Sequence, residues 1–156
     1  MKYWLMKSEP SAFSIDDLKK AGSEHWDGIR NYQARNYMRD DMKVGDRVLF
    51  YHSSTEVPGV VGTATVSREA YPDHTAFDPE SRYFDPKSSP DNPRWMMVDL
   101  TYESSFGQPV TLAEIRGMPK LKDMLVIRKG QRLSIQPVTK AEFETVLKFA
   151  RAREAR

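Results

Sequence analysis

The sequence predicts a small mixed α+β barrel of five to six strands, with short helices that close the ends of the barrel. Short apolar stretches rich in Val, Ile and aromatic residues recur along the chain and are separated by Gly, Pro and polar clusters. Helix start signals lie between and after these stretches. A chain of 156 residues fits one domain, which we expect to span residues 1–156.

The first part of the chain predicts one strand and two short helices. Residues 1–6 form an apolar strand that ends before Pro10, because a proline disfavours helical geometry in the residue before it. Ser14, followed three residues later by Asp17, is a capping box, and its helix ends at Gly22. A second helix begins near Asn31, a plausible N-cap, and fades by residue 41.

Two strands are predicted in the middle of the chain. Residues 47–52 form an apolar run that ends in a polar cluster, as expected for a buried strand. Residues 60–71 are rich in Val and Thr, and Gly62 interrupts them. A glycine inside a strand often marks a bulge, so we expect this strand to bend as small barrels require.

Residues 72–93 lack any periodicity and contain five of the chain's ten prolines. Irregular segments longer than about 15 residues are usually functional lids or compact surface loops. Because Phe77, Tyr83 and Phe84 are scattered through this one, we expect it to fold back onto the body.

The last part of the chain predicts two strands and two helices. A strand over residues 94–106 precedes a short helix at 112–118, a short apolar piece at 124–127 and a final strand at 132–138. A second capping box, Thr139 with Glu142, begins a C-terminal helix. Its apolar face consists of Phe143, Val146, Leu147 and Ala150.

Composition excludes several classes of function. The chain has no cysteine, which rules out thiol catalysis and thiolate metal sites and fits a reducing compartment. No apolar run approaches the ~20 residues of a membrane helix, and we expect a cytoplasmic protein without membrane contact. A net charge of +2 means that any binding to nucleic acid comes from a local patch.

The most informative segment is residues 26–36, WDGIRNYQARN. Trp26 and Tyr32 offer aromatic faces for stacking, Asn31 offers a side-chain amide, and Arg30 and Arg35 offer guanidinium groups for phosphate. These side chains suit recognition of a nucleobase better than catalysis of bond breaking. The alternatives are a Trp26 that caps the edge of the core and an Asn31 that serves only as an N-cap.

Several short motifs together resemble the EVE domain family, in that family's order and over nearly the whole chain. They are residues 7–10 (KSEP), 26–36, 51–53 (YHS), 59–62 (GVVG), 83–87 (YFDPK) and 132–138 (RLSIQPV). The resemblance implies a PUA-like pseudo-barrel, similar to the YTH readers of methylated adenine, with a pocket for modified bases in DNA or RNA.

The resemblance, together with the aromatic neighbours of Trp26, implies a set of pocket residues. They are Lys7, Ser8, Trp26, Asn31, Tyr32, Tyr51, His52, Ser53, Arg132 and Ser134. Burying one extra methyl group is worth only about 0.8 kcal/mol, a roughly fourfold preference. We therefore expect polar groups such as those of Asn31, Ser53, His52 and Ser8 to select the base.

The expected function is a non-catalytic, monomeric domain that binds nucleic acid without a cofactor. The three histidines are scattered, and no ligand spacing accompanies them, so we expect no metal site. One alternative is an enzyme that acts on modified nucleotides, with Glu9 and His52 as an acid and base pair. Another is a protein-interaction module that uses the loop at 72–93.

Overall fold

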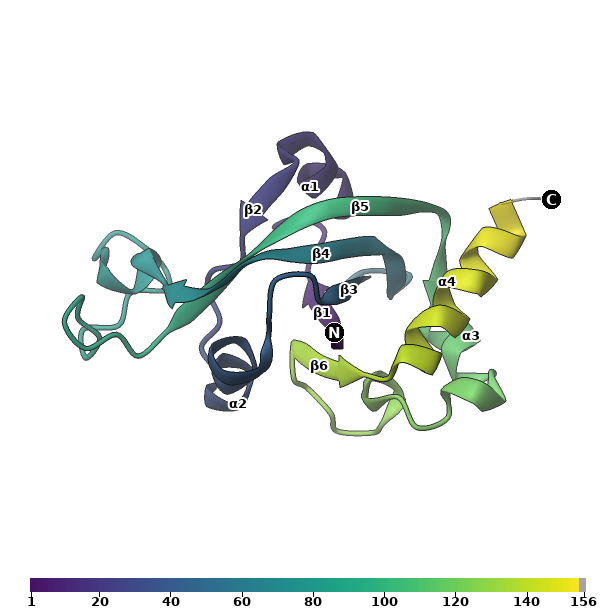
Figure 1. Ribbon diagram of the computed structural model, residues 1–156. Coiled ribbons are helices and arrows are strands. Elements are labelled where there is room, and N and C mark those ends of the chain that lie inside the picture. Colours follow the sequence, from purple (N-terminus) through teal and green to yellow (C-terminus); the bar gives the residue numbers. More distant parts are fainter. Residues whose placement is uncertain (155–156) are drawn as a thin grey trace.

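A computed structural model describes residues 1–154 and contains a six-stranded sheet with the strand order β2-β5-β4-β3-β1-β6 (Figure 1). The strands are β1 (Tyr3–Ser8), β2 (Ser23–His25), β3 (Arg47–His52), β4 (Gly59–Pro72), β5 (Met96–Thr111) and β6 (Ile135–Val138). The helices are α1 (Ile15–Ala21), α2 (Tyr32–Asn36), α3 (Leu112–Arg116) and α4 (Lys140–Glu154). Single turns of 3₁₀-helix lie at His74–Phe77, Pro119–Leu121 and Leu125–Ile127, and a π-helical turn at Tyr37–Asp41 follows α2.

The sheet is mixed because β1 and β3 run parallel, whereas the other pairs are antiparallel. The connection from β1 to β3 contains α1, β2 and α2. The parallel register places Lys7 beside Tyr51 and Ser8 beside His52 at the ends of the two strands. The predicted mixed α+β class is confirmed; the strand order has two ends, β2 and β6, and closure into a barrel stays a prediction.

Alternation along β1 and β3 divides the core into two clusters, because successive side chains of a strand point to opposite faces. The first core cluster takes Met6 and Phe50 and packs against residues of α1 and α2. The second takes Leu5, Leu49 and Tyr51 and packs against α3 and α4. A residue's position along the strand therefore decides which side of the sheet its side chain faces.

The predicted helix starts are confirmed by their hydrogen bonds. The Ser14 Oγ accepts from the Asp17 backbone N–H, and the Asp17 carboxylate accepts from the Ser14 N–H. The Asn31 side chain accepts from the Ala34 N–H at 3.0 Å. Thr139 and Glu142 form the same reciprocal pair at the start of α4. The sequence therefore determines the helix starts locally.

The predicted bulge in β4 is also present. The pairing register of β4 with both β3 and β5 shifts between Val60 and Gly62. A Cβ at Gly62 would overlap the carbonyl oxygen of Ser104, so only glycine allows β5 to approach this closely.

Some elements differ from the predicted ones. β2 was not predicted, since its three residues are polar and depend on pairing with β5. β5 continues past Phe106 to Thr111. β6 begins at Ile135 and not at residue 132, because the Leu133 N–H and carbonyl bond to the side chains of Gln131 and Gln136 in a turn.

The irregular segment between β4 and β5, which we call the 72–95 segment, folds back, as predicted. Its two ends are joined by the bond from the Asp73 N–H to the Trp95 carbonyl at 2.9 Å. Within it, the Trp95 Nε1 donates to the Asp85 carboxylate at 2.7 Å. Figure 1 shows this segment at one end of the long β4–β5 pair, with α3 and α4 at the other end.

Candidate functional site

A cavity of about 510 Å³ lies at the end of β1, and we call it the candidate cavity. Residues from four segments line it: the β1 exit, the segment around Trp26, the tip of the 72–95 segment and the start of β6. They are Lys7, Ser8, Glu9, Ala12, Phe13, Glu24, His25, Trp26, Asp27, Gly28, Ile29, Arg82, Tyr83 and Ser134.

Trp26 belongs both to the first core cluster and to the lining of the cavity. Its side chain is only 7% exposed. The indole meets Phe50 edge-on at 5.5 Å between ring centroids and Phe13 at 6.3 Å. Its backbone N–H donates to the Val98 carbonyl at 2.7 Å. The ring is therefore held rigidly at the cavity wall.

Tyr83 provides a second aromatic wall, and it rests on Gly28. Gly28 has φ +79°, and a Cβ there would come within 2.7 Å of the Tyr83 ring. The guanidinium of Arg30 donates to the Tyr83 carbonyl at 2.7 and 3.1 Å. Arg30 thereby ties the tip of the 72–95 segment to the Trp26 segment.

The same guanidinium is tethered to the start of that segment through Asp73. Arg30 Nη1 lies 3.0 Å from the Asp73 carboxylate, which is fully buried and also accepts from the Gly28 N–H at 2.8 Å. Burial alone would raise the pKa of Asp73, but hydrogen bonds from Thr75, Gly28 and Arg30 outweigh it and lower the pKa. Arg30, predicted to bind phosphate, donates here to protein acceptors.

Three predicted polar residues meet at the strand end of the cavity. The Lys7 N–H donates to the Ser134 carbonyl at 2.8 Å, which extends the β1–β6 ladder. The Ser8 Oγ donates to the Phe13 carbonyl at 2.6 Å, so the hydroxyl oxygen stays available as an acceptor. Burial lowers the pKa of Lys7.

Carboxylates make the rest of the lining acidic. Glu24 and Asp27 flank His25, whose Nδ1 lies 2.8 Å from the Glu24 carboxylate and whose Nε2 lies 3.7 Å from that of Asp27. Glu9 is exposed at the β1 exit. These groups are hydrogen-bond acceptors that face a cavity with aromatic walls.

The residues predicted at the end of β3 lie outside the cavity lining. Tyr51 is buried in the second core cluster, on the other side of the sheet. His52 accepts from the Ile15 N–H through Nε2 at 3.1 Å and so caps α1; burial lowers its pKa. Ser53 donates its backbone N–H to the Ser8 carbonyl at 3.0 Å.

The predicted residues around α2 also serve other contacts. Tyr32 is 52% exposed and stacks on Trp95 with 4.8 Å between ring centroids. Arg35 lies 4.7 Å over the Tyr32 ring and donates to the Arg94 carbonyl at 3.0 Å. Asn31 is the N-cap described above.

Arg132, also predicted for the pocket, is exposed two residues before Ser134. Sequence reasoning missed Phe13 and the contribution of Tyr83. A signal for Tyr83 was present, since it is one of the aromatics in the irregular segment. Its meeting with Gly28 depends on the long-range tether through Arg30.

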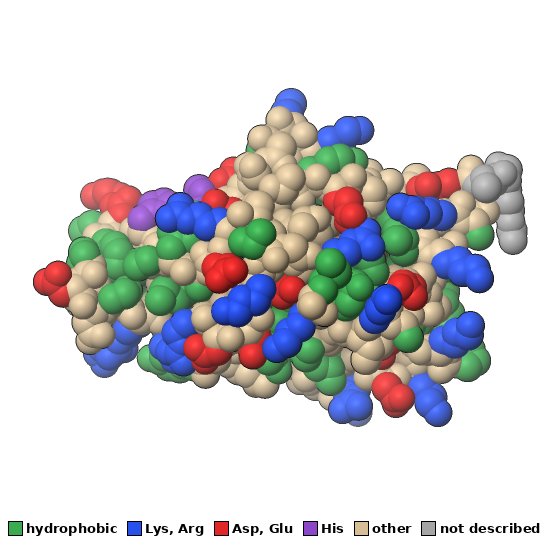
Figure 2. Space-filling view, viewed as in Figure 1, with side chains coloured by type: hydrophobic (Ala, Val, Ile, Leu, Met, Phe, Trp, Pro, Cys, Tyr) green, Lys and Arg blue, Asp and Glu red, His purple; other side chains and the backbone are tan. Residues whose placement is uncertain are grey.

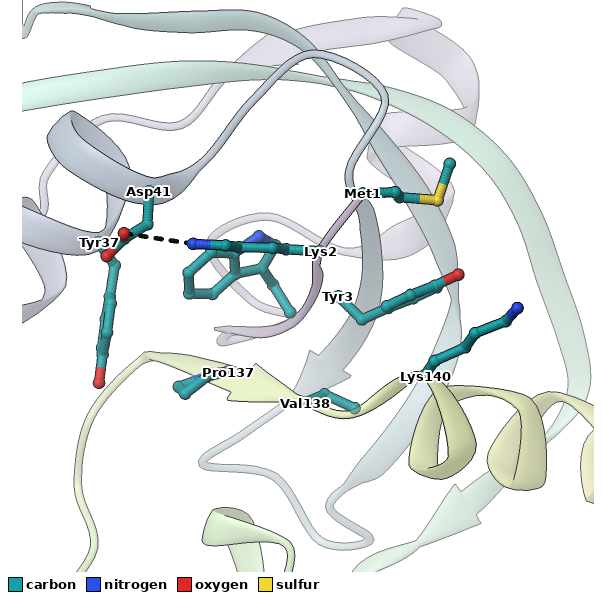
Figure 3. Close-up of a pocket in the computed structure, with 9 residues that line it drawn as sticks. Met1, Lys2, Tyr3, Tyr37, Asp41, Pro137, Val138 and Lys140 are labelled. Carbon is teal, nitrogen blue, oxygen red and sulfur yellow. Dashed lines mark hydrogen bonds and ion pairs between the residues drawn. The ribbon is translucent and has the colours of Figure 1, made fainter.

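A second, larger cavity of about 580 Å³ lies between the start of β1 and β6 (Figure 3). Tyr3, Tyr37 and Pro137 are among its walls. Its charged groups pair with protein partners: Lys2 lies 3.4 Å from Asp41, and Lys140 lies 3.9 Å from Glu144. None of the predicted pocket residues lines it.

Two general observations bear on partners. Within residues 1–154, no group of three or more His, Asp or Glu side chains is arranged to hold a metal ion. None of the helices in that range has the length and hydropathy needed to traverse a bilayer.

The chain is similar to proteins of known structure and name. A hypothetical protein from Leishmania major superposes with a TM-score of 0.94 at 46% identity, covering 99% of this chain and 97% of that one. Human THYN1 protein, solved in complex with 5-methylcytosine containing DNA, gives a TM-score of 0.89 at 42% identity, covering 96% and 98%. Thymocyte nuclear protein 1 of Danio rerio is 45% identical over 164 residues, which is 92% of this chain and 70% of the relative.

These relatives correct one expectation. The prediction of a cytoplasmic location is wrong, since the relatives in fish and mammals are named as nuclear proteins. The lack of cysteine indicated only a reducing compartment, and the nucleus is one as well.

A comparison of the whole domain agrees with the family that the short motifs suggested. A model of the EVE domain matches residues 2–149. Because this match spans nearly the whole chain, and because solved relatives share both sequence and fold, the chain belongs to the EVE domain family.

Proposed function

We propose that this protein is a non-catalytic nucleic-acid-binding domain that takes a modified base into the candidate cavity. The observation that carries the proposal is a preformed cavity with rigid aromatic walls and polar groups, in a chain whose human relative was solved with 5-methylcytosine containing DNA.

The size and walls of the cavity suit a flipped base. Its volume of about 510 Å³ lies within the range of small-molecule sites. Trp26 and Tyr83 offer aromatic surface, and stacking on such a ring contributes roughly 1–3 kcal/mol per base. That gain offsets much of the few kcal/mol that extruding a base costs.

The polar lining suits a base that carries an exocyclic amino group. Carboxylates accept hydrogen bonds from the N4 amino group of cytosine, and Glu9 and Asp27 are such acceptors in the lining. The hydroxyl of Ser8 adds a further acceptor. The Lys7 ammonium instead lies 5.9 Å over the Tyr51 ring, on the other side of the sheet. Burial of a 5-methyl group against the aromatic walls would then raise the affinity for the base only about fourfold.

Binding is a better reading of these contacts than catalysis. The proposed acid and base pair needs Glu9 and His52 in one site, but the cavity lining includes only Glu9. The His52 Nε2 is engaged by the Ile15 N–H, which leaves no free basic nitrogen at that position.

The experiment is a titration of short DNA strands, single and double, that carry one central 5-methylcytosine or cytosine, followed by fluorescence anisotropy. We expect tighter binding of the methylated strand. Trp26→Leu removes the aromatic wall and should weaken binding about 5- to 150-fold, the equivalent of one lost stacking contact. Matching RNA strands test the choice of polymer.

The matched control is Trp4→Leu. Trp4 lies in the same core cluster and is also buried, but it lines the cavity of Figure 3 and not the candidate cavity. Its indole N–H donates to the Asp46 carboxylate at 3.0 Å, so this control loses a buried hydrogen bond as well. Both variants lose stability, which thermal unfolding measures. Equal affinity of wild type and a folded Trp26→Leu for the methylated strand would refute the proposal.

A further inference from the structure

Unpaired cations lie on the segments that form two different walls of the candidate cavity. On one side, Arg82 is exposed, lines the cavity and lies 5.1 Å over the Tyr83 ring. On the other side, Arg128, Lys129 and Arg132 are exposed in the turn that leads into Ser134. None of these four forms an ion pair with a carboxylate of residues 1–154.

The turn that carries the second group is ordered by its own hydrogen bonds. The Gln131 N–H donates to the Arg128 carbonyl at 3.2 Å, and the Gln136 side chain donates to the Leu133 carbonyl at 2.9 Å. Ser134 is fixed to Lys7 at the cavity wall. The turn that carries these cations is therefore fixed to the cavity wall at its Ser134 end.

Some cations elsewhere are held by protein carboxylates. Arg30, Arg47 and Arg153 pair with Asp73, Glu103 and Glu114. On the face shown in Figure 2, basic and acidic side chains are interspersed and form no continuous basic surface. A phosphate would therefore be selected locally, by the groups that flank the cavity.

The carboxylates of the cavity lining disfavour a phosphate in its interior. Glu9, Glu24 and Asp27 belong to the lining and would repel a phosphate that entered. An occupant thus inserts its neutral base and leaves its phosphates at the mouth, where the unpaired cations lie.

We propose that the cavity takes an internal nucleotide of a strand, whose two flanking phosphates are contacted by Arg82 on one side and by Arg128, Lys129 and Arg132 on the other. This inference rests on the proposed function and adds the residues that hold the phosphates on either side of the base, so that tight binding needs a strand and not a free nucleoside or mononucleotide. Of the sequence-based candidates for phosphate, Arg30 ties two walls of the cavity together, whereas Arg35 contacts Tyr32 and Arg94 outside its lining.

The test measures the salt dependence of binding. A single strand with one central 5-methylcytosine and the nucleoside 5-methyl-2′-deoxycytidine are titrated over a series of KCl concentrations, against wild type, Arg82→Gln, Arg132→Gln and the double variant. Each lost phosphate contact should reduce the slope of log K against log salt by about 0.7 for a single strand. In Arg132→Gln, which changes a residue outside the cavity lining, affinity for the nucleoside, measured by NMR shifts, should stay within twofold.

The controls are Arg151→Gln and Arg82→Lys. Arg151 is exposed on α4, which Figure 1 shows at the opposite end of the molecule from the 72–95 segment, and its loss should leave the slope unchanged. Arg82→Lys should restore the slope. Unchanged slopes in Arg82→Gln and Arg132→Gln, an equal change in Arg151→Gln, or strand binding without salt dependence would overturn the inference.

The two proposals fail differently. If methylated and plain strands bind equally, yet the slopes fall in Arg82→Gln and Arg132→Gln, the inference holds and selection of a modified base is refuted. If methylation improves binding but the slopes do not change, selection of a modified base is supported and the inference about the phosphate contacts is refuted.

Discussion

The ring of Tyr83 lies on the backbone of Gly28, so closely that a Cβ at position 28 would come within 2.7 Å of the ring. This contact joins the loop between β4 and β5 to the segment that carries Trp26. It sets where one wall of the candidate cavity lies relative to another.

Gly28→Ala should displace Tyr83 and weaken both stability and binding. An alanine at φ +79° costs about 1–2 kcal/mol, and the overlap with the ring adds to it. Gly130→Ala is the matched control, because Gly130 has the same φ of +79° and a Cβ there would have no neighbour within 4 Å. Denaturant unfolding of both variants isolates the ring contact; equal losses would contradict it.

Asp73→Asn should release the 72–95 segment. It breaks a buried ion pair with Arg30 and weakens the bonds to Gly28 and Thr75, at a cost of about 3 kcal/mol. Trypsin should then cleave after Arg82 faster than in wild type. Asp40→Asn removes the partner of Arg39 in an exposed pair and should leave the cleavage rate unchanged.

The Asp73 carboxylate also predicts that acid lowers the stability of the protein. The pKa of Asp73 in the folded state is lower than in the unfolded chain, where it is about 3.9. Its stabilising contribution is therefore complete above that unfolded value and is lost as the pH falls through the folded pKa. The free energy of unfolding of wild type should fall more steeply below pH ~4 than that of Asp73→Asn; parallel curves would contradict this.

His52 predicts a second pH effect, at milder acidity. Burial lowers its pKa, although the Asp16 carboxylate opposes the shift, and the bond from the Ile15 N–H requires an unprotonated Nε2. Stability is therefore complete above the unfolded value of about 6.5 and declines as the pH falls through the folded pKa. In His52→Gln, whose amide oxygen can accept the same bond, this decline should be smaller, and NMR titration of His52 gives the pKa directly.

Tyr32→Ala should leave binding of a base unchanged. Tyr32 stacks on Trp95 and lies outside the cavity lining, so its loss costs about 0.5–1.5 kcal/mol of stability. An anisotropy titration with the methylated strand checks this. A tenfold loss of affinity in the folded variant would place Tyr32 in the site after all.

The sequence predicted the helix starts and the bulge well, because residues close together in the chain determine each of these features. The Ser14 and Thr139 capping boxes and the glycine at the bulge act within a few residues, and each is found as expected. β2 escaped prediction because its pairing with β5 is entirely non-local.

For a similar reason, the sequence predicted only some of the residues that line the candidate cavity. Lys7, Ser8, Trp26 and Ser134 do line one cavity. Tyr51 follows the alternation of β3 to the other face of the sheet, and His52 caps α1, which no spacing in the sequence reveals. Arg30 carries the expected charge, but its buried acceptor Asp73 lies 43 residues further along the chain.

The tether through Asp73 and Arg30 makes one side chain the common anchor of the segment between β4 and β5. The Asp73 N–H joins the two ends of the segment through the Trp95 carbonyl, and the Asp73 carboxylate pairs with Arg30. Arg30 also holds the Tyr83 carbonyl, so a change confined to this one residue would free the start and the tip of the segment together.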